Sequence, residues 1–139
     1  MTKRRRGSRT ARTRPRRTPR HRPFEDLVDE ALATIPMPFA AALDEVAIVI
    51  ADEPTPEQLR TNDIPGDEGL YGLYEGVPRT EWGADWVTMP NRITLFRLPL
   101  EADFADPDDL ADEVWVTVVH ELAHHLGIDD ERLHELGVD

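Results

Sequence analysis

The sequence predicts one compact domain in which helices are mixed with a few short strands. Its 139 residues, 40 % of them apolar, suit a single globular unit and leave too little chain for a second one. A run of five apolar, mainly β-branched residues at 46–50 predicts a strand. Two adjacent apolar rows at helical spacing between residues 107 and 126 predict a long buried helix.

The basic side chains are concentrated near the N-terminus. Residues 1–22 hold eleven of the 16 Lys and Arg residues and no acid, so the rest of the chain has five basic residues against 28 acidic ones. A like-charged tract rich in Arg, Thr and Pro has almost nothing apolar to bury, so we expect a disordered tail over 1–22 and the folded domain over 23–139. Such a tail binds nucleic acid through phosphates, folds back on the acidic domain, or is a solvated extension. Nucleic acid as a partner would rest on this tail alone.

Composition excludes several other classes of protein. Cysteine is absent, which excludes disulfides, thiolate metal sites and a cysteine nucleophile, so any metal ion must be held by His and carboxylate side chains. The chain has no apolar run of about 18 residues, so we expect no membrane partner and a cytoplasmic location. A Gly-rich phosphate loop is also missing, and nucleotide binding has no support.

The first half of the domain is expected to begin with an amphipathic helix over 24–35, where apolar residues recur at helical spacing and acids fill the first turn. A second, short helical piece is expected over 39–44. The apolar run at 46–50 is expected to form a buried strand. Prolines, Asp, Asn and Gly mark 55–69 as a connecting loop with at most one helical turn, at 55–58.

The second half is expected to add two strands, over 70–76 and 92–97, and a short fourth strand over 86–89. The long helix should begin after Asp106, because this residue is a good N-cap and is followed by Pro and two more acids. It should run over 107–126 and end before Gly127.

This long helix contains the pattern H-E-x-x-H, formed by His120, Glu121 and His124. Two His residues four positions apart lie on one helix face about a turn from each other, so both imidazoles can bind one zinc ion. Glu121 is adjacent to the first ligand, and its carboxylate can take a proton from metal-bound water as that water attacks a carbonyl.

A third ligand must come from the chain beyond the helix. Gly127 suits the left-handed conformation that ends helices, and three residues later the carboxylate of Asp130 can approach the metal ion. Three protein ligands and one water describe a catalytic zinc site. His134 is the weaker alternative to Asp130, because the Gly-x-x-Asp spacing favours the aspartate.

Written out, the motif is H-E-x-x-H-x-x-G-x-x-D over residues 120–130, and it resembles the motif of the minimal zincins, small bacterial proteins with a matrix-metalloproteinase-like domain. The resemblance spans roughly residues 24 to 137. It implies an α+β fold with a small mixed or antiparallel sheet of three to four strands packed on helices, the motif helix among them. It also implies that the strand near 92–97 is an edge strand that binds an extended peptide.

Residue by residue, the resemblance implies one zinc ion held by His120, His124 and Asp130, with Glu121 as catalytic acid/base. The chain departs from the metzincins in having no methionine after the motif. The expected function is therefore hydrolysis of a peptide or protein substrate by zinc-activated water. The alternative is a regulatory or protein-interaction module that keeps the zincin fold without turnover.

Four further residues are candidates for supporting roles at the predicted zinc site. Tyr71, Tyr74 and Arg92 are candidates to stabilise an oxyanion, although packing or surface charge explains each of them as well. His125 cannot share the face of His124, so we expect it to lie behind the ligands or at the surface.

Overall fold

The computed structural model describes residues 2–3, 23–62, 64, 69–76 and 91–137 of the chain. Within these residues one mixed sheet of four strands has the order β1-β3-β4-β2. The strands are β1 Thr2–Lys3, β2 Ala47–Ala51, β3 Leu70–Glu75 and β4 Arg92–Phe96. Strand β4 pairs antiparallel with β3 and parallel with β2, and β1 pairs antiparallel with the other side of β3.

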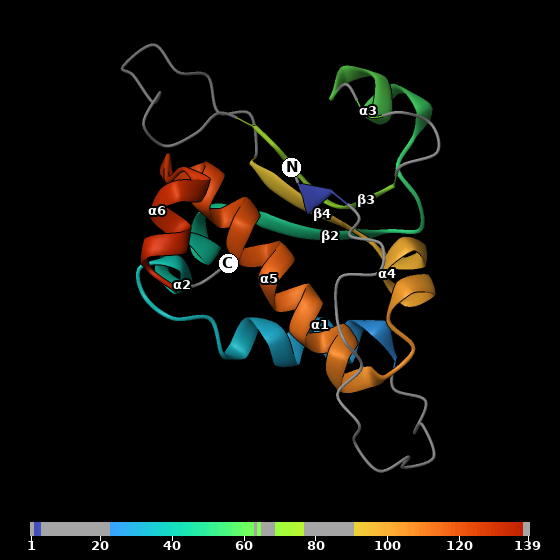
Figure 1. Cartoon of the computed structure of the whole chain (residues 1–139), viewed down its shortest axis with the longest axis horizontal. Helices are drawn as coiled ribbons and strands as arrows, with labels where there is room; N and C mark the ends of the chain where they lie inside the picture. The colour runs from blue at the N-terminus through green and yellow to red at the C-terminus, as the bar shows by residue number, and fades with distance from the viewer. Residues whose placement is uncertain (1, 4–22, 63, 65–68, 77–90, 138–139) are drawn as a thin grey trace.

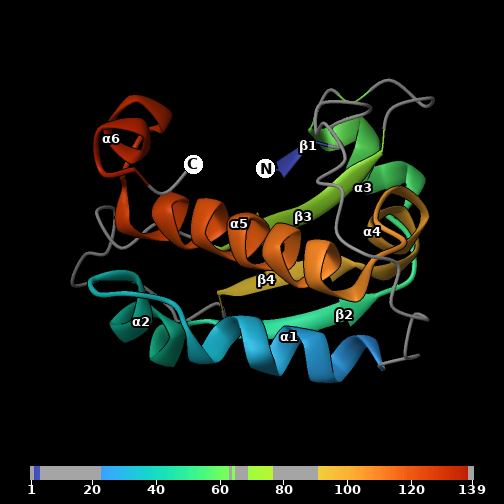
Figure 2. The same cartoon turned by 60° about the horizontal axis from the view of Figure 1, so that its bottom comes forward.

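The helices lie mainly on one face of this sheet (Figure 1). They are α1 Phe24–Ala33, α2 Phe39–Ala42, the 3-10 helix η1 Leu43–Glu45, α3 Pro56–Thr61, α4 Arg97–Asp103, α5 Pro107–Leu126 and α6 Asp130–Glu135. Helix α5 runs across β3 and β4, and α1 packs along it (Figure 2). The sequence expectation of an α+β fold with a small sheet packed on the motif helix is confirmed.

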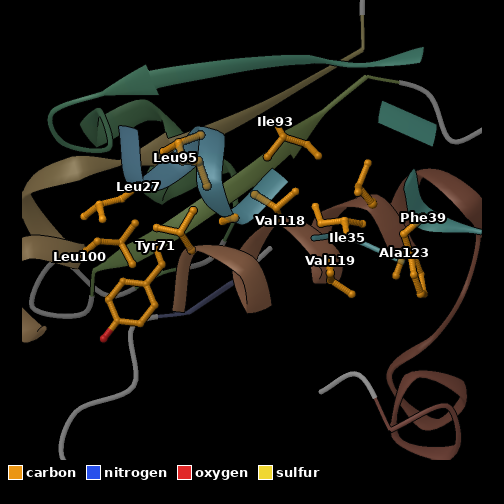
Figure 3. Close-up of a cluster of buried hydrophobic side chains, with 14 of the residues drawn as sticks. Leu27, Ile35, Phe39, Tyr71, Ile93, Leu95, Leu100, Val118, Val119 and Ala123 are labelled. Carbon is orange, nitrogen blue, oxygen red and sulfur yellow. The ribbon is translucent and has the colours of Figure 1, made fainter. Parts of the chain in front are cut away.

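The main hydrophobic core lies between α1, α5 and the sheet. Apolar side chains from these elements meet there, including Leu27, Tyr71, Ile93, Leu95 and Val118 (Figure 3). A smaller cluster contains Ile64, Leu70, Leu73 and Phe96, with Leu59 of α3 packed against it. Since Leu95 and Phe96 are neighbours on β4 and point to opposite faces, the sheet is covered on both sides.

Helix α5 has the bounds that the sequence predicts, 107–126. The carboxylate of Asp106 accepts hydrogen bonds from the backbone N–H groups of Asp108 and Asp109, at 2.8 and 3.4 Å, which satisfies two donors of the first turn. At the other end Gly127 has a φ of 71°, the left-handed conformation expected of it. The predicted helices at 24–35 and 39–44 and the strands at 46–50 and 70–76 are also found, within a few residues.

The expectation that the strand near 92–97 is an edge strand is wrong. Strand β4 lies between β3 and β2, and its residues Ile93 to Phe96 are all buried. A strand with both faces covered belongs inside a sheet. Arg97 is not part of it, because this residue begins α4, a helix that the sequence analysis did not predict.

The run at 46–50 forms a strand, but not a buried one. Strand β2 is an edge strand, and Val49 in its centre is 40 % exposed. Its β-branched residues reflect strand propensity, which an edge strand shares with a buried one.

Two further segments are more helical than expected. In the expected loop over 55–69, α3 extends over six residues because Thr55 and Gln58 form a reciprocal capping box. After the motif helix, α6 begins at Asp130 because the Asp129 side chain accepts a hydrogen bond from the Arg132 backbone N–H at 2.8 Å.

Part of the expected N-terminal tail has a defined place in the fold. Thr2 and Lys3 form β1, with Thr2 opposite Gly72 and Lys3 opposite Leu70. Residues 4–22 and the expected strand at 86–89 lie outside the described residues, so the expected tail and its boundary at residue 23 stay a prediction. Among the helices that the structure describes, none is long and apolar enough to cross a membrane.

Candidate active site on the long helix

The motif residues lie in the last two turns of α5, over β3. His120 and His124 are partly exposed, and the side chain of His124 is 39 % accessible. Glu121, between them in sequence, is fully buried. The helix therefore presents two partly exposed imidazoles one turn apart, with Nε2 of His120 itself buried, and it directs the carboxylate of Glu121 inward.

The carboxylate of Glu121 is held by groups from three elements. The Thr2 hydroxyl donates to its Oε1 at 2.6 Å, and the backbone N–H of Tyr74 donates to its Oε2 at 3.0 Å. Nδ1 of His124 lies 3.4 Å from the same Oε2. Every one of these neighbours is suited to an ionised carboxylate, and a hydrogen bond to a charged acceptor is stronger than one between neutral groups.

The electrostatics of this carboxylate follow from its neighbours. Burial raises the pKa of the Glu121 carboxyl, whereas hydrogen bonds to its charged form, from His124 and Thr2 among others, lower it, and the net pKa is below the usual value. Glu121 is therefore ionised at neutral pH, the state that a proton acceptor needs.

A buried polar chain supports the site from behind. The Tyr74 hydroxyl lies 2.9 Å from Nδ1 of His125, whose Nε2 is 2.8 Å from a carboxylate oxygen of Glu45. His125 is fully buried. The same Tyr74 thus contacts His125 through its side chain and Glu121 through its backbone, so the chain Glu45–His125–Tyr74 fixes the strand that carries a partner of Glu121.

The predicted third metal ligand is not part of this cluster. Asp130 is exposed at the start of α6, and among the described residues no three His, Asp or Glu side chains stand close enough together to hold a metal ion. His134 is likewise exposed on α6. His120 and His124 fit zinc in donor type and spacing, whereas neither candidate for the third ligand has been brought to them.

Each of the three oxyanion candidates contacts another side chain, and their part in stabilising an oxyanion stays a prediction. The Tyr71 hydroxyl donates to Asp103 at 2.6 Å, Arg92 pairs with Glu75 at 3.2 Å, and the Tyr74 hydroxyl contacts His125. His125 is buried, so it does not lie at the surface, one of the two positions expected of it.

Sequence reasoning missed two residues of this cluster, Thr2 and Glu45. Thr2 is 119 positions from its partner Glu121, and Glu45 is 80 positions from His125. No local pattern links such distant positions, so neither contact has a signal in the sequence.

The fold and the site together define a zincin-type protein: a small sheet covered by a long helix that carries H-E-x-x-H on its accessible side. The family model for zincin-like metallopeptidases matches residues 43–138, more than half of the chain. The chain belongs to this family of zincin-like metallopeptidases. A comparison with curated proteins found no match.

Proposed function

We propose that the protein is a zinc-dependent peptidase in which His120, His124 and Asp130 hold one zinc ion and Glu121 is the general base. The observation that carries the proposal is the state of Glu121. This carboxylate is buried, ionised and hydrogen-bonded on both oxygens, and it directly follows a residue of the His pair in sequence. It occupies the position of the general base in the H-E-x-x-H motif, and an ionised carboxylate there can accept a proton from water.

When bound, zinc supplies a Lewis acid and lowers the pKa of its water. The residues of the chain transfer the proton and orient the base. Glu121 takes the proton from the attacking water at its carboxylate and later delivers it to the leaving amine. The Tyr74 backbone N–H keeps the carboxylate oriented during both transfers. Asp130 reaches the ion only if the turn at residues 127–129 brings the start of α6 toward the His pair.

The rival function is a zincin-fold interaction module that binds metal without turnover. The two functions differ in the role of Glu121, since an interaction module requires the metal ligands but no general base. Glu121→Gln has nearly the shape of the wild-type residue and removes the proton acceptor, so it separates the two.

The test measures zinc content and peptide hydrolysis in the same preparations of full-length protein, purified without chelator. The expected result is one equivalent of zinc in the wild type, none in His124→Ala or Asp130→Ala, and hydrolysis of unstructured peptides by the wild type alone. Glu121→Gln should keep its zinc and lose at least about 100-fold in kcat.

His134→Ala is the matched control for Asp130→Ala, because both residues are exposed on α6. Zinc retained by Asp130→Ala and lost by His134→Ala would reassign the third ligand. No hydrolysis by either wild type or Glu121→Gln, with zinc bound, would leave the interaction module. Equal hydrolysis by the two would overturn Glu121 as the general base.

A further inference from the structure

The edge of β3 beside Glu121 is covered by another part of the same chain. Along β3, Leu70 lies opposite Lys3 and Gly72 lies opposite Thr2. Two residues further on, the backbone N–H of Tyr74 donates a hydrogen bond to Glu121. Strand β1 therefore ends on the edge of β3 at the position of the proposed general base. Figure 2 shows β1 on the outer side of β3, on the side away from β4.

Thr2 is buried at this edge and contacts the Glu121 carboxylate. Thr2 is 3 % exposed, and β1 packs against α5 as well as β3. Its hydroxyl donates to the Glu121 carboxylate at 2.6 Å. A hydroxyl that donates to Glu121 at this distance takes the place that the attacking water needs for its proton transfer, because a carboxylate oxygen can take a proton only from a group in hydrogen-bond contact with it.

Without β1, β3 would be an edge strand with unpaired backbone groups next to Glu121. Such an edge binds extended peptides through main-chain hydrogen bonds. Strand β1 is antiparallel to β3 at this edge, and its Thr2 side chain contacts Glu121. It therefore occupies the backbone groups and the carboxylate that an incoming peptide would use.

We infer that the Thr2–Lys3 segment is an intramolecular peptide ligand that blocks the β3 edge and Glu121, and that it must leave before another peptide can bind. This inference rests on the proposed function for its effect on catalysis. The pairing of β1 with β3 does not depend on catalysis, so the pairing and the peptidase activity can be tested separately.

The test uses the full-length chain and the substitution Thr2→Asp. An aspartate at this position places a second carboxylate against Glu121 in a buried site, where like charges repel strongly, so the segment should leave β3. Thr10→Asp is the matched control, because it adds the same charge to the same basic stretch of sequence. Thr2→Ser keeps the hydroxyl and should keep the segment in place.

Hydrogen–deuterium exchange reports the pairing without any need for activity. In Thr2→Asp, amides between Leu70 and Gly72 are expected to exchange at least about 10-fold faster than in the wild type, with amides of α1 and α5 unchanged as a check on folding. Thr10→Asp and Thr2→Ser should match the wild type. A synthetic peptide of residues 1–6, MTKRRR, added to Thr2→Asp should restore the protection of β3.

The outcomes separate the two proposals. Unchanged exchange of β3 in Thr2→Asp would overturn the inference. Faster exchange with a several-fold rise in peptide hydrolysis would support both proposals. Faster exchange with no hydrolysis in any variant would keep the segment as a ligand of β3 and overturn the peptidase. Faster exchange with hydrolysis equal to that of the wild type would overturn the blocking role.

Discussion

His125 and His124 are neighbours in sequence with opposite environments. His124 is partly exposed, whereas His125 is fully buried and has a polar partner at each ring nitrogen, Tyr74 on one side and Glu45 on the other. An imidazole with partners at both nitrogens has a fixed orientation, and it holds both partners in turn. His125 is thus the residue that ties η1 and β3 to the motif helix.

We expect His125→Phe to fold with reduced stability. Phenylalanine fills the volume but removes the partly buried hydrogen bond between the ring and the Tyr74 hydroxyl, which costs about 1–3 kcal/mol. Glu45 retains contact with water, since its side chain is 28 % exposed, and should add little to this cost.

Urea unfolding of the metal-free protein measures this change. His134→Phe makes the same substitution on the surface and should change the free energy of unfolding by less than about 0.5 kcal/mol. Equal stability of the two variants would contradict a structural role for His125.

At the scale of elements, the contact between β3 and α5 places the motif helix. Gly72 lies under Thr117, one turn before His120, and a Cβ atom at Gly72 would stand 2.5 Å from Cγ2 of Thr117 and 3.4 Å from the carbonyl oxygen of Thr94. Glycine is therefore needed for the close approach of helix and strand.

Gly72→Ala should destabilise the protein by about 1–3 kcal/mol, because either α5 or β3 must move away to make room for the methyl group. The partner variant Thr117→Ser removes the Cγ2 atom that the methyl group meets. The double variant should therefore recover part of the loss, and a double-mutant cycle by urea unfolding measures the recovery. Additive losses would show that the strain lies elsewhere.

At the scale of the whole molecule, a zinc ion bound by residues of α5 and α6 would link α6 to the helix that forms the core. A ligand that binds only the native state stabilises it by about 2.7 kcal/mol when its free concentration is about 100 times Kd. Zinc should therefore raise Tm of the wild type by several degrees.

Differential scanning calorimetry with and without zinc checks this expectation. The rise in Tm should vanish with a chelator and in His124→Ala, where Tm with zinc is compared with Tm of the same variant without zinc. His134→Ala should keep the rise. An equal rise in His124→Ala would mean that zinc stabilises the chain from another site.

The sequence by itself determined the elements whose signals are local: the bounds of α5, its Asp106 cap and Gly127 end, and the His pair on its accessible side. These depend on helical spacing and on residues within one turn of each other. The family follows from the same short motif.

Only the tertiary structure decided which strand lies at an edge, what covers β3, and which groups hold Glu121. The order of strands depends on pairing between distant segments, and a strand of apolar residues looks alike in sequence at the centre and at the edge of a sheet. Thr2 meets Glu121, and Glu45 meets His125, because folding brings segments that are distant in sequence to the same helix. No spacing rule reaches over 80 or 119 positions.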